Sequence, residues 1–185
     1  MKLHIPKWVT ERLLSRAARS PYDHLPGYMN RYWLVPLADP VHGRGCGPVS
    51  WWRRPVAWTL QQFGIAVRIH EILRSDDDRA LHDHPWPYLT VILSGGYYEH
   101  TVDAFGELST WHGPGDVLYR SADFRHRLEL FRPFWFGVGA HDARARIPAV
   151  TLFITGRWQQ SWGFFPGTGE TKVSPKVYLS ERGHP

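Results

Sequence analysis

Two histidines lie two residues apart in the stretch Leu81-His82-Asp83-His84-Pro85-Trp86. Side chains alternate between the two faces of a β-strand, so His82 and His84 are expected to point one way and Asp83 the other. Two imidazoles on one face can supply two ligands to the same metal ion. The pair therefore predicts metal chemistry, provided that the fold brings a third ligand to it.

A third histidine, His126, opens an alternating stretch that ends at Phe131. In a strand it shares one face with Leu128 and Leu130, and the residues between them face the other way. The apolar face of a strand is expected to face the core, so we expect His126 to lie inside the domain.

His82, His84 and His126 are therefore the predicted metal ligands. Imidazole nitrogen suits borderline divalent metals; we expect Fe(II), and Zn, Ni, Co, Mn or Cu also fit this donor type. Three protein ligands leave positions open for water, oxygen or substrate, which is typical of a catalytic site. The alternative is three core histidines satisfied by hydrogen bonds, but a closely spaced pair with a third histidine on an inward face favours the metal.

The elements that must hold these side chains are short strands with turns between them. The segment 88–94 is rich in β-branched residues, and Gly95-Gly96 predicts a tight reversal into a return strand at 97–101. A second turn cluster at 113–116 leads into a short strand at 117–119. Further strands are predicted at 31–35, 65–73, 108–112, 134–139, 150–155 and 162–165.

Many short strands with Gly- and Pro-rich turns predict an all-β sandwich or barrel. Two helices are expected before it: Pro6–Ala18, whose Pro suits a first helical turn, and a short helix within Trp51–Phe63. We expect one domain in three parts: an N-terminal helix and loop-rich extension that packs on the barrel (1–64), the β core (65–165) and a tail that wraps the outside (166–185).

With its turns and histidines in this order, the sequence resembles the cupin superfamily over roughly residues 65 to 165. The likeness rests on His82-Asp83-His84 and Gly95 for one motif, and on Gly115-Asp116 and His126 for the other. It implies a double-stranded β-helix, or jelly roll, with a metal held by the histidines.

The Glu that completes the first cupin motif is absent, because Tyr88 and Leu89 stand in its place. In this respect the chain resembles the three-histidine cupins, a group that includes thiol and diketone dioxygenases. The wider string from Leu73 to Trp86 also resembles uncharacterised cupin-like proteins of phages and prophages. That second resemblance implies no reaction.

Four further side chains are candidates for acting on a ligand. Tyr88, in the place of the lost Glu, and Tyr97 are expected to position substrate or to donate a hydrogen bond. Arg68 and Arg125 are expected to clamp an anionic group. The alternative for the two tyrosines is ordinary core packing. His70 shares a face with Arg68, so we expect it on the surface or beside the ligands, not on the metal.

Charge and composition narrow the class of partner. The net charge is +5, yet 18 of the 22 basic residues are Arg scattered in ones and twos, which argues against a nucleic-acid footprint. The one cysteine, Cys46, permits no internal disulfide, and no apolar run suits a signal or a membrane span. We expect a cytoplasmic protein without a membrane partner that binds a small molecule and pairs through exposed sheet edges as a homodimer.

Three functions remain open from the sequence. The first is a mononuclear non-heme Fe(II) dioxygenase acting on a small anionic or chelating substrate. The second, from another class, is a non-catalytic, metal-stabilised binding or structural cupin of phage type. The third is a sugar isomerase or epimerase, which needs a base and a polar pocket; the ten Trp argue mildly against it.

Overall fold

The computed structural model describes residues 2–22, 24–35, 51, 54–76, 80–132, 146–167 and 170–180. The predicted strand at 134–139 and the loop that contains Cys46 lie outside the described residues.

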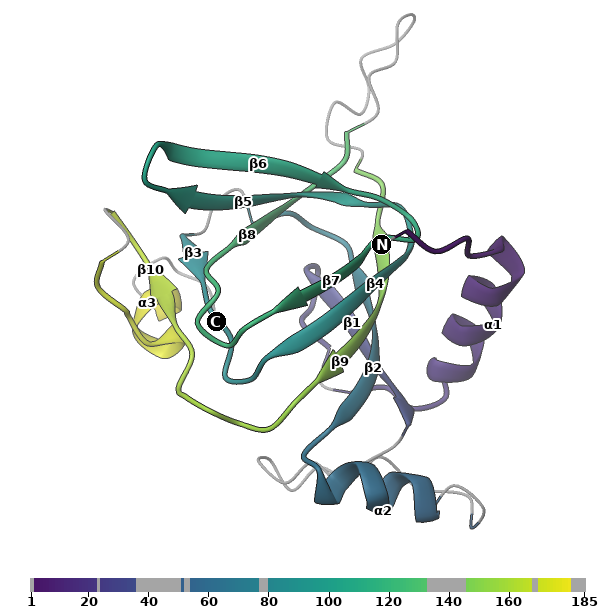
Figure 1. The fold of residues 1–185 in the computed structure, drawn as a ribbon. Helices are drawn as coiled ribbons and strands as arrows, with labels where there is room; N and C mark the ends of the chain where they lie inside the picture. Colours follow the sequence, from purple (N-terminus) through teal and green to yellow (C-terminus); the bar gives the residue numbers. More distant parts are fainter. Residues whose placement is uncertain are drawn as a thin grey trace, which may run out of the picture.

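Antiparallel β-sheets dominate the described chain, and they lie in two main layers (Figure 1). The five-stranded sheet has the order β1-β2-β9-β4-β7 and the three-stranded sheet the order β6-β5-β8, with a small β10-β3 pair beside them. The strands are β1 (Met29–Val35), β2 (Ala66–Ile72), β3 (Leu81–His82), β4 (Tyr88–Ser94), β5 (Tyr97–Asp103), β6 (Gly106–His112), β7 (Val117–Arg120), β8 (Arg127–Leu130), β9 (Ala149–Thr155) and β10 (Phe164–Phe165). The helices are α1 (Lys7–Ala17), α2 (Arg54–Gln62) and α3 (Pro175–Ser180).

This arrangement confirms the predicted jelly roll. Sequential strands β4 and β5 lie in different sheets, because the reversal at Gly95 and Gly96 carries the chain from one layer to the other. Gly95 has a φ of 70°, and a Cβ there would lie 2.2 Å from the carbonyl oxygen of Pro148. Only glycine meets both conditions without strain.

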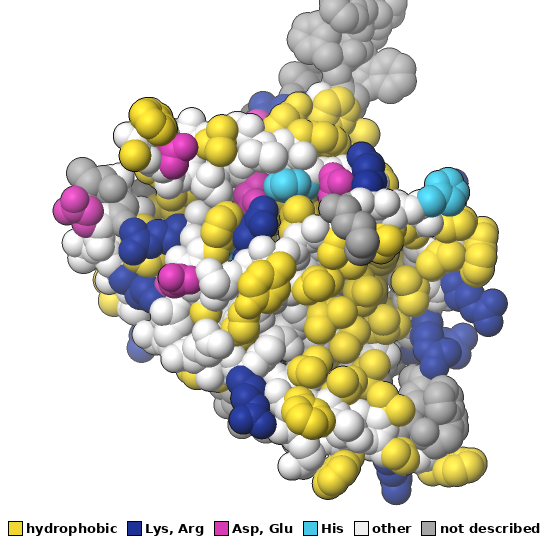
Figure 2. Space-filling model, viewed as in Figure 1, with side chains coloured by type: hydrophobic (Ala, Val, Ile, Leu, Met, Phe, Trp, Pro, Cys, Tyr) yellow, Lys and Arg dark blue, Asp and Glu magenta, His cyan; other side chains and the backbone are white. Residues whose placement is uncertain are grey.

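The five-stranded sheet has one face toward the other sheet and one face toward α1. Residues paired directly across antiparallel strands share a face, so Arg68, Phe153 and Thr90 lie on one side. Ile69 and Val91 lie on the other side, where they form an apolar cluster with Ala17 of α1. Figure 2 shows hydrophobic side chains gathered over β4 and β9 beside this helix.

Between the two sheets lies a second cluster of buried residues that closes one end of the barrel. Its members come from both layers and are Ile72, Ile92, Tyr97, Leu128, Leu130 and Ala149. Leu128 and Leu130 face inward as predicted, and so does His126, which is 4% exposed. The alternation of apolar residues in this stretch therefore predicted its buried face correctly.

Both predicted helices are present within one or two residues of their expected bounds. Pro6 stands just before α1 with an extended backbone, and its carbonyl oxygen accepts a hydrogen bond from Val9 N at 2.9 Å. None of the described helices combines the length and apolar content that a membrane crossing requires.

Three local features differ from the sequence predictions. The tail after residue 165 contains α3, whose Tyr178 stacks on Phe164 with ring centroids 4.2 Å apart. Ser75 and Asp76, polar residues whose burial nothing in the sequence indicates, are fully buried because they accept backbone hydrogen bonds from Leu130 and Leu128. The segment before residue 65 supplies β1, which forms an edge of the five-stranded sheet.

Candidate metal centre

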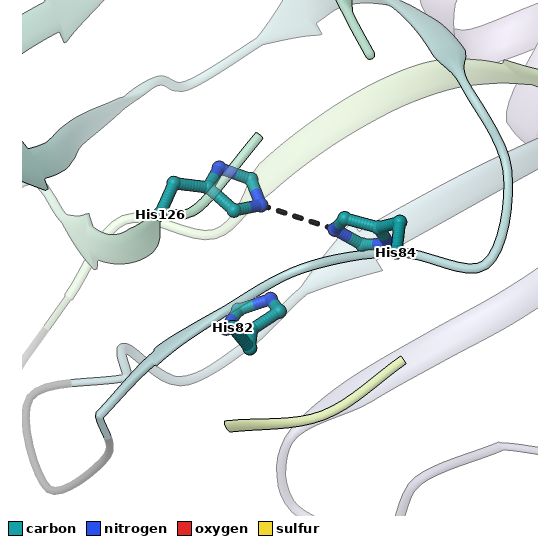
Figure 3. A group of neighbouring side chains, drawn as sticks. All are labelled: His82, His84 and His126. Carbon is teal, nitrogen blue, oxygen red and sulfur yellow. Dashed lines mark hydrogen bonds between the residues drawn. The ribbon is translucent and has the colours of Figure 1, made fainter. Parts of the chain in front are cut away.

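The three predicted ligands lie together. The ring nitrogens that His82, His84 and His126 offer all lie within 4.8 Å of one another, and the Nε2 atoms of His84 and His126 are 3.1 Å apart. Figure 3 shows the three rings directed toward a common point from two separate segments. The spacing rule for the H-x-H pair therefore placed both imidazoles correctly.

Backbone hydrogen bonds bring these segments into register. His82 N donates to His126 O at 2.8 Å, and His126 N donates to His82 O at 3.0 Å, which forms an isolated antiparallel bridge. His84 N donates to Ala122 O at 3.1 Å. The ligand positions are thus fixed by main-chain pairing, which is more precise than a loop would allow.

Asp83, between the two histidines, faces away from them and anchors the strand. It is 1% exposed and accepts hydrogen bonds from Gly163 N at 2.8 Å and from Gln160 Nε2 at 3.0 Å. Lys172 forms an ion pair with it. Its opposite orientation is the one that strand alternation predicts.

Glu99 of β5 touches the third histidine on the side away from the other two. Its Oε1 lies 2.8 Å from His126 Nδ1. An ionised carboxylate only accepts hydrogen bonds, so Nδ1 must carry the proton and Nε2 must present its lone pair to the site. This is the arrangement by which carboxylates orient metal-binding histidines.

The charge of Glu99 is compensated by two more donors. Arg120 contacts both carboxylate oxygens, and His112 Nε2 lies 3.2 Å from Oε2. Burial by itself raises the pKa of Glu99, but hydrogen bonds from His112, His126 and Arg120 hold it well below its usual range. Glu99 is therefore ionised, and it is a poor base.

Tyr88 lies at the site as expected from its place in the motif. Its hydroxyl is 3.2 Å from His126 Nε2, and its ring centroid lies 4.6 Å from that of His84. Burial, followed by the charge of Glu99, raises the pKa of Tyr88 well above its usual value, so the phenol is neutral. A neutral phenol at this point can donate a hydrogen bond to a metal-bound ligand.

The site is partly open. His126 is buried, whereas His82 and His84 are partly exposed. Loss of hydration, together with the neighbouring histidines, lowers the pKa of His84 well below its usual value, so its ring is neutral. Neutral imidazole is the form that binds metal.

His70 is buried, so the first of its two predicted positions, on the surface, is wrong. Its ring is 8% exposed and stacks on Phe153 with centroids 4.5 Å apart. It was expected on the surface because Arg68, on the same face, is charged. That face instead points between the two sheets.

The described contacts of the other three candidates are with other residues. Tyr97 belongs to the buried cluster between the sheets, and its nearest described ring contact is His112 at 6.1 Å. The guanidinium of Arg125 lies 3.9 Å from the centre of the Phe165 ring. The guanidinium of Arg68 lies between aromatic rings, 4.7 Å from the centre of Trp33 and 5.5 Å from that of Trp86.

The donor set fits a divalent transition metal. Two ligands that bind one ion at about 2.1 Å lie no more than about 4.2 Å apart, close to the separation of these nitrogens. The locked tautomer of His126 and the neutral ring of His84 supply the lone pairs that such an ion needs. The Tyr88 hydroxyl borders this cluster, 3.2 Å from Nε2 of His126.

Two antiparallel sheets, with an H-x-H pair before β4 and a third histidine before β8, form a jelly roll in which the histidines of two segments meet. No family model matches the sequence, and no curated protein matches it. Among solved structures, the chain is similar to the 7S globulin of Momordica charantia, with 11% identity over 89% of this chain and 42% of that one and a TM-score of 0.46. It is also similar to a variant of oxalate decarboxylase from Bacillus subtilis, with 13% identity over 89% of this chain and 35% of that one and a TM-score of 0.44.

A third similar structure is a protein of Ralstonia eutropha described provisionally as a mannose-6-phosphate isomerase. It shares 20% identity over 51% of this chain and 75% of that one, with a TM-score of 0.37. The present chain spans less than half the length of the globulin and the decarboxylase.

Glu99 is the residue that sequence reasoning missed. Strand alternation places it on the same face as Tyr97, and β5 pairs with β8 so that Glu99 lies opposite Leu128, two residues from His126. The available signal was an acidic residue on the strand face that is otherwise expected to point inward.

Proposed function

We propose that this chain is a mononuclear non-heme metal dioxygenase that acts on a small anionic or chelating substrate. His82, His84 and His126 hold the metal in this proposal, with Fe(II) as the expected ion. The observation that carries it is the convergence of three imidazole donors, with the ring of His126 oriented by Glu99 through Nδ1. Three neutral ligands leave the ion its full double charge, which favours an anionic ligand.

In this role a bound Fe(II) supplies open positions for a chelating substrate and for dioxygen. Tyr88 orients the substrate by donating its hydroxyl proton to the oxygen atom nearest His126. Phe153, packed against Tyr88 with ring centroids 4.9 Å apart, excludes water from that side. Glu99 keeps the His126 ring in place throughout.

The isomerase alternative requires a general base at the site, and a buried carboxylate is one candidate for that role. Among the described residues, the two buried acids beside the ligands are already engaged. Glu99 accepts from three cationic or histidine donors, and Asp83 points away toward Gly163. Neither has the environment of a general base, which supports the oxygenase over the isomerase.

Anaerobic purification followed by elemental analysis tests the proposal first. Iron at one equivalent, with oxygen uptake that depends on an added chelating acid, supports the dioxygenase. Zinc or no metal, without turnover in an iron-reconstituted sample, supports the non-catalytic binding protein.

His84→Gln is the variant of choice, because it removes one donor and keeps a polar side chain. His100→Gln is its matched control, since His100 lies on the outer face between Glu107 and Glu129. Metal should be lost from the first variant and kept by the second. The homodimer and the cytoplasmic location stay predictions, which light scattering and fractionation test.

A further inference from the structure

Two buried nitrogen atoms on the inner side of the five-stranded sheet have no hydrogen-bond partner among the described residues. They are Nε2 of His70 and Nε1 of Trp86. Buried polar groups without partners are rare because each costs the lost hydration of that group. A pair of them close to a ligand site indicates atoms that a bound molecule satisfies.

Both nitrogens belong to residues near the candidate metal centre, and the ring of Phe153 lies between His70 and that centre. Phe153 stacks on His70 at 4.5 Å, and the same ring lies 6.3 Å from the ring of His84, measured between centroids. Trp86 is two residues from His84, and Arg68 is the cross-strand partner of Phe153. Phe153 therefore separates the three histidines from a second polar region.

Arg68 makes that region positively charged. Its guanidinium carbon lies 5.5 Å from the centre of the Trp86 ring, and its positive charge is close enough to help lower the pKa of His70. A guanidinium and an indole N–H are both donors only. The group that satisfies the indole N–H of Trp86 must be an acceptor, and beside the positive charge of Arg68 an anionic oxygen is favoured.

We propose that His70, Trp86 and Arg68 form a subsite for the carboxylate at the far end of a ligand whose other end chelates the metal. The ligand class is a small dicarboxylic acid with a chelating head, and Phe153 packs against its carbon chain. This inference rests on the proposed function, because the chelating end needs the metal.

Zn(II)-loaded protein tests the subsite without turnover, because zinc has no redox chemistry. The probes are 2-hydroxy dicarboxylic acids of three to six carbons, each compared by calorimetry with the 2-hydroxy monocarboxylic acid of the same length. At the best length the diacid should bind at least about tenfold more tightly, the worth of a charge-assisted hydrogen bond. Equal affinities at every length overturn the subsite, whereas failure to load metal overturns the proposed function and this inference together.

Substitutions then locate the effect. Trp86→Phe keeps the ring and removes only the N–H, and Arg68→Met keeps much of the stem and removes the charge. Each should abolish most of the diacid preference and leave the monoacid affinity unchanged. Arg127→Met makes the same chemical change on the outer sheet, where Arg127 pairs with Glu107, and should retain the preference. A preference that survives both inner substitutions refutes the assignment, and the parent series remains decisive if either variant fails to fold.

Discussion

Replacing Glu99 with Gln changes one oxygen of the carboxylate that orients His126 into an amide nitrogen. The two sides of Glu99 are not equivalent. Oε2 receives Arg120 Nη2 and His112 Nε2, whereas Oε1 receives His126 Nδ1 at 2.8 Å and Arg120 Nε at 3.3 Å. The one remaining oxygen of Gln is best placed toward Oε2, where its donors are closest. The amide nitrogen then faces His126.

An amide N–H facing Nδ1 reverses the tautomer of His126. Nδ1 becomes the acceptor, and the proton moves to Nε2, the atom that has to bind the metal. Metal binding must then displace a proton and break the new hydrogen bond. Loss of such an orienting carboxylate costs about 10- to 100-fold in metal affinity, or about 1.4–2.7 kcal/mol.

Competition with a coloured chelator measures this loss directly. Glu129→Gln is the matched control, because Glu129 lies on the outer side of the same sheet, 3.0 Å from His100 Nε2. The metal affinity of the control should equal that of the parent. The melting temperature of the metal-free Glu99→Gln protein shows whether the fold persists.

An unchanged metal affinity in a folded Glu99→Gln protein would refute the orienting role of Glu99. Equal losses in Glu99→Gln and Glu129→Gln would also contradict it, because they would report general weakening of the sheet and not a change at His126.

Three further results are expected. Tyr88→Glu should keep or strengthen metal binding and weaken binding of a small chelating acid relative to Tyr88→Phe, because it cancels part of the metal's charge; equal acid binding by both variants and the parent contradicts this. Metal-free protein should lose stability as the pH falls below about 6.5: burial lowers the pKa of His70 and of His84, so the unfolded chain binds more protons. The free energy of unfolding, from denaturant titrations, should drop by up to about 1.4 kcal/mol per pH unit for each ring. A midpoint that is flat between pH 7 and 5 would show that neither ring stays neutral. Asp83→Asn should lower the free energy of unfolding by about 1–3 kcal/mol through the loss of the Lys172 pair, and a urea titration that matches the parent would exclude it.

The ligands were predictable because the signal was local. Alternation fixed the shared direction of His82 and His84 and the inward face of His126, and both depend only on neighbouring residues. The β-branched runs and Gly-rich turns likewise gave the strands of both sheets.

The surroundings of the ligands depended on pairings that no short window contains. Glu99 reaches His126 because β5 pairs with β8. Ser75 and Asp76 are buried because they bond to the backbone of β8, more than fifty residues away in sequence. The surface position predicted as one alternative for His70 was wrong for a related reason. The strand face that carries the charged Arg68 points inward, where aromatic rings surround this side chain.

The small β10-β3 pair has a consequence for the order of assembly. β3 carries His82 and pairs with β10, and its neighbour Asp83 is held by Gly163 and Lys172. The segment that carries His82 and His84 thus gains part of its backing from chain that is synthesised about eighty residues later. Closing so long a loop is slow compared with forming a hairpin. During translation His82 and His84 therefore emerge well before all the segments that hold them in their final geometry.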